Sequence, residues 1–354
     1  MKKVAVFVGR FQPVALAHQE IIEKAKKEFD ELVVIIGSDG ATCSLRNPFS
    51  TEIRRKMLES VGVKPENILS IRDSYYNFNW WVQSIYELVE KWRKINIGNG
   101  VEISIIGHYK DIDSYWLNAF PKWKFFDSGK LENNIGATIV RFGFFNKLKD
   151  AEPFTHDYYK IKNFSQEIPN KIYEMLKEWK DDNIKTWNTL NEEMKFVTNY
   201  KKKWEDAPYP PIFTTVDSLI EYNDHTLLIK RGKLPGKGLF ALPGGFLEPN
   251  EKILDGAFRE LYEETNIKLD TKYLKQMLRK VKVFDDIHRD ERGRIITHLH
   301  HFDCYCTKIG IFPEITAGDD ANEVMWYPIK KLNKISNQFY SDHFKIIMNI
   351  LEKK

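Results

Sequence analysis

Two apolar runs of strand length open the chain, and an amphipathic segment separates them. Residues 4–8 and 32–36 are rich in β-branched side chains, whereas residues 18–29 place apolar side chains at helical spacing. The same alternation continues with predicted helices at 51–61 and 80–92 and predicted strands at 68–71 and 101–106. This strand–helix rhythm predicts a parallel sheet with helices on both faces and ligands at the carboxyl ends of its strands.

The pattern changes in the middle of the chain. Residues 164–204 are helical in pattern and highly charged, and we interpret their closing Lys201-Lys202-Lys203 as a solvated helix face. The segment 206–211 then ends the helix, because its two consecutive prolines lack backbone donors. Beyond it the pattern predicts strands at 213–216, 226–229 and 298–305, a helix at 253–265 and a C-terminal helix after Ser341. We predict a first domain at 1–185, a helical and Pro-rich linker at 186–207, and a second domain at 208–354.

Composition narrows the class of protein. The chain has 354 residues, 42% of them hydrophobic, which suits two domains at roughly 100–200 residues each. Its 54 Lys+Arg and 50 Asp+Glu give a net charge of +4, without the concentrated basic face that nucleic-acid binding needs. No apolar run approaches the roughly 20 residues that span a bilayer, and the N-terminal apolar stretch is too short for a signal peptide. Three cysteines do not form a disulfide framework, so we expect a cytoplasmic protein that binds neither nucleic acid nor membrane.

The most specific motif of the chain is a set of charged residues at fixed spacing. It reads Gly245-x5-Glu251-x7-Arg259-Glu260-Leu261-x-Glu263-Glu264-x-Asn266-Ile267. On a helix, Glu260, Glu263 and Glu264 stand at i, i+3 and i+4 and share one face. Clustered carboxylates repel one another unless a cation lies among them, and hard oxygen ligands suit Mg²⁺ or Mn²⁺ bridging a diphosphate. We expect Arg259 to tether Glu251 or a neighbouring carboxylate. A solvated acidic helix is the alternative, which so many fixed positions disfavour.

This motif resembles the Nudix box of diphosphohydrolases. It departs from the box only at Asn266, where the family has a glycine that ends the helix in a left-handed conformation. The departure is conservative, because Asn is the residue type that next best tolerates this conformation. The resemblance implies an α+β domain (an α/β/α sandwich) and a Mg²⁺ cofactor, with Mn²⁺ as its substitute. By this resemblance, Glu260 and Glu264 are the main metal ligands and Glu251 is a supporting ligand. Glu263 also supports the metal site and is taken among the catalytic residues.

The substrate class of this domain follows from a weaker resemblance. Residues 284–298 are similar to Nudix enzymes that act on ADP-ribose and to their regulator relatives, and an aromatic ring with arginines can stack a base and hold phosphates. The implied ADP-ribose-binding residues are Phe284, Arg289, Arg292 and Arg294, although a surface hairpin would have the same composition. Such enzymes often recruit a loop carboxylate as general base; the candidates are Asp319, Asp320 and Glu323, and Asp320 is taken among the catalytic residues.

A second motif follows the first predicted strand, Gly9-Arg10-Phe11-Gln12-Pro13-Val14-Ala15-Leu16-Ala17-His18. Gly9 allows a tight exit from the strand, and the next helix points its amino terminus at the sheet edge, where its dipole and free N–H groups favour phosphate. The motif resembles the (His/Thr)-x-Gly-His nucleotidyltransferases, and its Gly-Arg-Phe-Gln-Pro form resembles nicotinamide mononucleotide (NMN) adenylyltransferases of the archaeal type. Ala15 stands where that family has its first histidine, which contacts ATP phosphates or their metal. This substitution is either tolerated or disables the transfer reaction.

Further segments resemble the same family in the same order. Residues 44–54 resemble its phosphate-binding loop, 73–82 its NMN site, and 136–141 its second fingerprint, in which Thr138 caps a helix; residues 107–111 form a candidate adenine-side loop. The implied catalytic residues, which hold phosphates, are Arg10, His18, Arg46 and Arg141. The implied ATP-binding residues are Gly9, Phe11, Arg54, Gly107 and Thr138. The implied NMN-binding residues are Asp73, Asn77 and either Trp80 or Trp81, whose ring would stack on the cationic nicotinamide.

Together, the two resemblances cover nearly the whole chain and imply the family of bacterial bifunctional NMN adenylyltransferase/Nudix hydrolases. They imply an α/β first domain with a parallel Rossmann-like sheet that forms NAD and pyrophosphate from ATP and NMN. They also imply a second domain that hydrolyses a nucleoside diphosphate, with ADP-ribose giving AMP and ribose 5-phosphate as the first choice. The alternatives are a Nudix half that only senses its ligand and a transferase that acts on another nucleotide acceptor. Exposed aromatic residues permit a homo-oligomer without establishing one.

Overall fold

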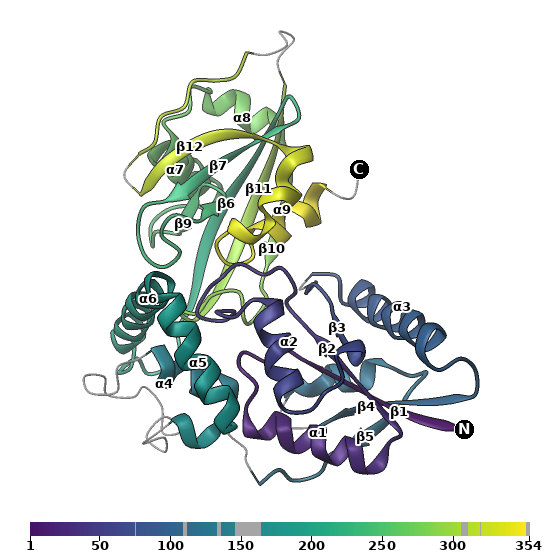
Figure 1. The fold of residues 1–354 in the computed structure, drawn as a ribbon. Coiled ribbons are helices and arrows are strands. Elements are labelled where there is room, and N and C mark those ends of the chain that lie inside the picture. The colour runs from purple at the N-terminus through teal and green to yellow at the C-terminus, as the bar shows by residue number, and fades with distance from the viewer. Residues whose placement is uncertain are drawn as a thin grey trace. The chain divides into compact units, whose positions relative to one another are not determined.

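The computed structural model describes residues 1–74, 76–108, 112–132, 136–145, 164–305, 311–318 and 320–351 (Figure 1). The chain divides into two compact units, Met1–Met194 and Lys195–Lys354, and each unit is built on its own sheet. The division lies inside helix α6 (Ile184–Lys202), which takes up most of the segment expected between the domains. Among the described residues, no helix has both the length and the apolar character that crossing a membrane requires.

The first unit is built on a five-stranded sheet in the order β3-β2-β1-β4-β5, in which every neighbouring pair is parallel. Its strands are β1 (Lys2–Gly9), β2 (Glu31–Ile36), β3 (Ile68–Ser70), β4 (Val101–Gly107) and β5 (Lys124–Asp127). Val4–Val8 of the central strand are buried without interruption, as expected of a strand covered on both faces. The chain runs from β1 through β2 to β3 on one side and then crosses to β4 on the other side of β1, which creates the switch point where such sheets bind ligands. The predicted parallel Rossmann-like sheet is confirmed.

The first three helices of the first unit begin close to their predicted positions, and further helices follow them. In order, they are α1 (Leu16–Glu28), α2 (Thr51–Ser60), α3 (Phe78–Asn96), α4 (Ala137–Phe145) and α5 (Asn170–Asp182). In α3, the apolar positions Ile85, Val89 and Trp92 recur at i, i+4 and i+7 and pack into the core under the sheet. Thr138 is the second residue of α4, so the prediction that it caps this helix is wrong.

The second unit is built on a mixed sheet with the path β10-β11-β6-β7-β12. Its strands are β6 (Ile212–Tyr222), β7 (His225–Arg231), β10 (Leu278–Phe284), β11 (Arg294–Cys304) and β12 (Ala321–Pro328), with β8 (Phe240–Ala241) beside β7 and β9 (Gly244–Phe246) beside β6. β6 and β11 are parallel, and the other pairs are antiparallel.

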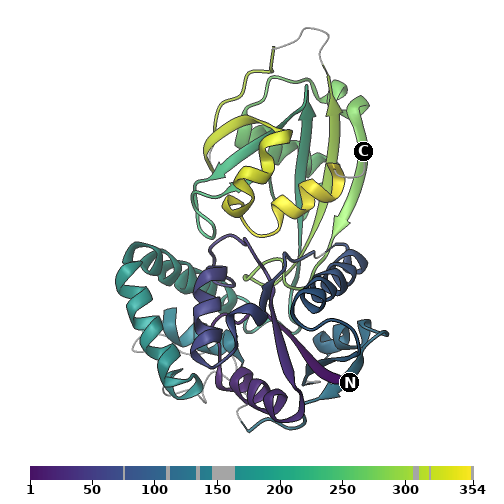
Figure 2. The same cartoon turned by 45° about the vertical axis from the view of Figure 1, so that its right-hand side comes forward.

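Helices cover both faces of this second sheet. They are α7 (Ile253–Thr265), α8 (Thr271–Met277) and α9 (His343–Leu351), and Figure 1 and Figure 2 place α7 and α9 on opposite faces. Phe258 and Leu261 of α7 pack on Ile220 and Phe302 of the sheet. The predicted α/β/α sandwich is therefore confirmed, and α7 has the bounds that the sequence pattern predicts.

Candidate active sites

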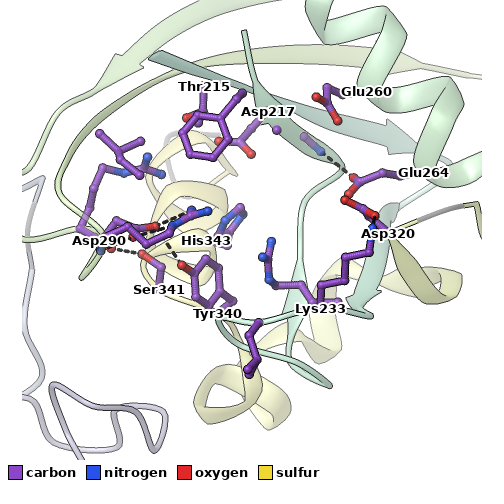
Figure 3. A pocket seen from close by; sticks show the side chains of 18 residues that line it. Thr215, Asp217, Lys233, Glu260, Glu264, Asp290, Asp320, Tyr340, Ser341 and His343 are labelled. Carbon is purple, nitrogen blue, oxygen red and sulfur yellow. Dashed lines mark hydrogen bonds and ion pairs between the residues drawn. The ribbon is translucent and has the colours of Figure 1, made fainter. Parts of the chain in front are cut away.

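The second unit contains a polar cavity of about 300 Å³ beside α7 (Figure 3). Its lining is rich in charged side chains of both signs. The anionic lining residues are Asp217, Glu260, Glu264, Asp290 and Asp320, and the cationic lining residues are Arg231, Lys233, Arg289 and Arg292. A cavity with both kinds of group can bind a ligand that carries phosphates together with a metal ion.

Two of the glutamates predicted from the motif reach this cavity. Glu260 and Glu264 stand one helical turn apart on α7. Burial raises the pKa of Glu264 to about 8, against the hydrogen bond that its Oε2 accepts from the Gly244 N–H at 2.8 Å. Burial also raises the pKa of Glu260. A cation between the two carboxylates would favour their charged forms.

Arg259 gathers the carboxylates of the motif. Its Nε and Nη2 donate to Glu251 at 3.0 and 2.7 Å, and its Nη1 donates to Glu260 at 2.8 Å and to Glu263 at 3.0 Å. This confirms the expected tether and extends it to three glutamates. These charge-assisted bonds lower the pKa of Glu251 and hold the end of the preceding loop against α7. The Glu263 side chain is 54% exposed and does not line the cavity.

The donor chemistry at this end of the cavity fits a divalent cation. Carboxylate oxygens are the ligands that Mg²⁺ and Mn²⁺ prefer, and the buried carboxylate of Glu264 lies in the same cavity as that of Glu260. In the part of the chain that the structure describes, no three His, Cys, Asp or Glu side chains are already grouped as a metal site would require. Arg259 holds the nearby glutamates in this arrangement.

The end of α7 shows how the chain accommodates its departure from the Nudix box. Asn266 adopts the left-handed conformation, with φ 44° and ψ 30°, and its N–H donates to the Tyr262 carbonyl at 2.9 Å. Its side-chain Nδ2 also donates to the Thr316 carbonyl at 3.1 Å. The prediction that Asn266 takes over the role of the helix-ending glycine is confirmed.

Of the four residues predicted to bind ADP-ribose, two line the cavity. Arg289 donates from Nε and Nη2 to Asp342, both at 3.1 Å, and Arg292 donates to Asp290 from Nε at 3.0 Å and from Nη2 at 2.8 Å. These ion pairs are buried. They hold the two guanidinium groups in place, and the Arg292 guanidinium also lies over the Phe246 ring, 5.0 Å from its centroid.

The other two predicted ADP-ribose-binding residues lie elsewhere. Phe284 has no exposed surface, because it ends β10 with its ring turned into the core, so the prediction that it stacks a base is wrong. Arg294 donates to the Asp285 carbonyl and is not part of the cavity lining.

The three candidate general bases differ in where they lie. Asp320 lines the cavity and pairs with Lys233 (Figure 3). Glu323 does not line it, and pairs instead with Lys230 at 3.3 Å. Asp319 lies outside the described residues.

Several cavity residues were not predicted from the sequence. Arg231 lies over the ring of Tyr340, 4.4 Å from its centroid, and its Nε donates to the Pro235 carbonyl at 2.9 Å. Tyr340 lies shortly before α9 and His343 is the first residue of that helix; neither belongs to a motif recognised in the sequence. Asp217 lies within β6 and belongs to no motif recognised in the sequence.

In the first unit, the loop after β1 approaches the amino end of α1. Phe11 is buried, with its ring centroid 5.3 Å from that of Phe7 and 5.1 Å from that of His18, so its side chain is not a ligand contact. The Ala15 N–H donates to His18 Nδ1 at 3.0 Å, which places the proton of the neutral imidazole on Nε2. Ala15 itself has no exposed surface. Position 15 thus contributes a backbone donor that orients His18.

Arg54 organises the backbone of this site. It is 1% exposed, and its guanidinium donates to the carbonyls of Arg10 at 2.8 Å, Gly37 at 2.6 Å and Ser38 at 3.1 Å. Two further bonds reach Ser50 and Thr51. Its five N–H donors are therefore matched by five acceptors within the fold, and a direct phosphate contact would require one of these bonds to break.

Arg141 and Gln12 connect α4 to the loop after β1 and to the loop before α2. Arg141 Nη1 donates to the backbone carbonyl of Gln12 at 2.6 Å, and its Nη2 donates to Thr138 Oγ1 at 3.1 Å. The Gln12 side chain donates to the Phe49 carbonyl at 2.9 Å and accepts from the Phe49 N–H at 3.0 Å. Arg46 is half-buried in the loop before α2 that Phe49 closes.

The candidate NMN residues lie at the start of α3 and just before it. Asn77 caps the helix, since its Oδ1 accepts from the Trp80 N–H at 3.2 Å, and Asp73 accepts from the Ser38 N–H at 2.9 Å. Trp80 is 51% exposed, whereas Trp81 stacks on Phe78 and packs against the core. The structure thereby leaves the Trp80 ring accessible. Gly107 ends β4, and residues 109–111 of the expected adenine-side loop lie outside the described residues.

Comparisons with known proteins find relatives of each half and of the whole chain. The Cytidylyltransferase-like family matches residues 6–125, and the NUDIX domain family matches residues 213–349. The Nicotinamide/nicotinic acid mononucleotide adenylyltransferase of Acinetobacter baylyi is 28% identical over 186 residues, 51% of this chain and 87% of that protein. The ADP-ribose pyrophosphatase of Methanocaldococcus jannaschii is 35% identical over 153 residues, 43% of this chain and 80% of that protein.

Two solved structures match along the full length. A bifunctional NMN adenylyltransferase/ADP ribose pyrophosphatase from Francisella tularensis is 34% identical, with a TM-score of 0.86 and coverage of 100% of this chain and 99% of that one. A structure with the same name and organism, complexed with AMP and a Mn ion, is 33% identical, with a TM-score of 0.85 and the same coverage.

Proposed function

Since the chain belongs to the family of bifunctional NMN adenylyltransferase/ADP-ribose pyrophosphatases, we propose that it is an enzyme with both activities. Its first unit transfers the adenylyl group of ATP to NMN, forming NAD and pyrophosphate. Its second unit hydrolyses ADP-ribose to AMP and ribose 5-phosphate. The observation that carries the proposal is the full-length match, in which one chain contains both halves at 34% identity.

In the first unit, the NMN phosphate is itself the nucleophile toward the α-phosphorus of ATP, so the protein supplies position and charge. We assign phosphate binding to Arg10, Arg46, Arg141 and the Nε2–H of His18. Arg54 holds the backbone on which these groups stand. The exposed ring of Trp80 is available to stack on the nicotinamide.

In the second unit, we assign metal binding to Glu260 and Glu264, with Glu251 and Glu263 held nearby by Arg259. Bound there, Mg²⁺, or Mn²⁺ in its place, would supply charge neutralisation and a water of lowered pKa. Asp320 is assigned as the general base because it alone among the described candidates lines the cavity. Arg289 and Arg292 are assigned to hold the substrate, because their buried partners fix both guanidinium groups.

The test is a substrate panel on the full chain with Mg²⁺. We expect NAD from NMN and ATP, and AMP from ADP-ribose, each faster than from nicotinate mononucleotide or from other nucleoside diphosphates. Formation of no dinucleotide from any acceptor would show that Ala15 has disabled the transferase. Tight binding of ADP-ribose without release of AMP would show that the second unit only senses its ligand.

A further inference from the structure

His343 is a buried histidine whose Nε2 makes no hydrogen bond with the described residues. It is the first residue of α9, it is 7% exposed, and it lines the cavity together with Asp217 and Glu264 (Figure 3). Its Nδ1 accepts a hydrogen bond from the backbone N–H of Leu242 at 3.2 Å. Among the described residues this is the imidazole's only hydrogen bond. A polar side chain that is buried to this extent normally has its hydrogen-bonding groups satisfied.

The bond from Leu242 decides which nitrogen carries the proton. A backbone N–H can only donate, so Nδ1 is the acceptor and the neutral ring has its hydrogen on Nε2. Burial lowers the pKa of His343, which keeps the ring neutral near pH 7. The neutral ring, which lines the cavity, therefore offers a single N–H donor, at Nε2.

The segment Leu242-Pro243-Gly244 brings this donor to the metal-binding end of the cavity. The N–H of Leu242 holds His343, and the N–H of Gly244 holds the carboxylate of Glu264 at 2.8 Å. Pro243 has no N–H, and its carbonyl accepts from the Ser218 N–H at 2.8 Å, which fixes the segment to β6. The imidazole and the carboxylate are thus positioned by alternate residues of one short strand-like segment.

We propose that His343 donates a hydrogen bond from Nε2 to a phosphate oxygen of the diphosphate substrate, as a binding residue of the hydrolase site. The inference rests on the proposed function of the second unit. A diphosphate held beside Glu264 offers acceptor oxygens at this place.

Two amide substitutions separate the roles of the two ring nitrogens. An Asn side chain places its amide near the position of Nδ1, so His343→Asn keeps an acceptor for Leu242 and removes the donor to the cavity. A Gln side chain reaches the position of Nε2, so His343→Gln keeps the donor and gives up the bond to Leu242. The two variants thus lose opposite halves of the imidazole's hydrogen bonding.

The measurements are ADP-ribose hydrolysis with Mg²⁺ and calorimetric binding of ADP-ribose in EDTA, both on the full chain. We expect His343→Asn to raise KM and the dissociation constant about ten- to a hundredfold, as loss of one hydrogen bond to a charged acceptor does. His343→Gln should stay within about threefold of the parent protein in both constants, with a lower melting temperature. NAD formation by the first unit serves as the internal control for the amount of folded protein.

Equal constants for His343→Asn and the parent protein would overturn the proposal, as would equal losses in the two variants, which would indicate a packing role alone. If the parent protein neither binds nor hydrolyses ADP-ribose, the proposed function of the second unit fails and this inference fails with it. That result is distinguishable, because it appears before any substitution is made.

Discussion

Gln12 shows how one side chain can organise a site that it need not touch. Its side-chain amide pairs with both backbone groups of Phe49, which ties the loop of Arg10 to the loop of Arg46. Its backbone carbonyl accepts from Arg141 of α4, so Arg141 depends on where this loop is held. Only a carboxamide of this length can both donate and accept here. Gln12 is therefore a positioning residue for the phosphate-binding arginines of the first unit.

Replacement of Gln12 tests this role. Gln12→Glu loses the donor to Phe49, and Gln12→Met loses both bonds. We expect each variant to lose about 1–3 kcal/mol of transition-state stabilisation, as calculated from its kcat/KM for ATP, mainly because KM rises. KM for NMN should change less. The matched control is Gln83→Met, at an exposed glutamine of α3. A fall in kcat with an unchanged KM for ATP would indicate loss of folded protein instead of misplaced arginines.

Asp290 links stability to pH in the second unit. Its side chain is 5% exposed, and burial would raise its pKa, yet the Arg292 guanidinium holds the pKa below its ordinary value. A depressed carboxyl pKa stabilises the fold above the ordinary value near 3.9 and loses that contribution as the pH falls through the folded-state value.

Asp290→Asn should therefore cost about 3–5 kcal/mol in the free energy of unfolding near pH 7, because Arg292 is left buried without its anion. The difference from the parent protein should shrink as the pH falls below about 4, because the carboxylate of the unfolded chain is protonated first, and it should vanish once the pH has passed the lower folded-state pKa. Urea unfolding of both proteins from pH 3 to 7 measures this difference in the free energy of unfolding. A difference independent of pH would exclude the ion pair as its source.

At the scale of elements, helix α7 carries both the packing of the second unit and its metal ligands. Its apolar face buries Phe258 and Leu261, and its polar face presents Glu260 and Glu264. Where the helix ends decides where this polar face stops, and Asn266 ends it in a left-handed conformation. The cap is therefore part of the site's construction.

Substitutions at this cap separate conformation from side-chain bonding. Asn266→Gly loses the bond to Thr316 but adopts the left-handed conformation without strain, so we expect a change within about 0.5 kcal/mol. Asn266→Ala loses the bond and retains the strain, which should cost about 1–2 kcal/mol. Thermal unfolding followed by circular dichroism compares them. Equal melting temperatures for the two variants would show that α7 does not depend on this conformation.

At the scale of the whole molecule, two units with separate sheets each contain their own candidate site. Each set of assigned residues lies within one unit. The two activities are therefore expected to respond separately to substitutions.

We expect Glu264→Gln to lower ADP-ribose hydrolysis by at least a hundredfold, because a metal ligand is lost, and to leave NAD formation within about twofold. His18→Asn should do the reverse, since it keeps the acceptor for the Ala15 N–H and removes the Nε2–H. Both assays on one preparation of each variant make the comparison. Parallel losses of both activities would contradict the separate assignment.

The sequence alone determined the features that depend on near neighbours along the chain. The strand–helix rhythm predicted the parallel sheet, and the residue spacing predicted α7 and its shared carboxylate face, while the resemblance to the Nudix box implied its left-handed end at Asn266. Helix and strand periodicity depend on residues that are close together in the sequence, so these patterns can be recognised without knowing the fold.

Only the tertiary structure decided which residues meet across long stretches of chain. Arg141 binds Gln12 across 129 residues, and His343 binds Leu242 across 101. It also turned Phe284 into the core and left Trp80, unlike Trp81, exposed to solvent. The burial of a side chain and the partners of a polar group are decided when sheets and helices pack together. They cannot be predicted from local spacing, because the packing brings together residues far apart in the sequence.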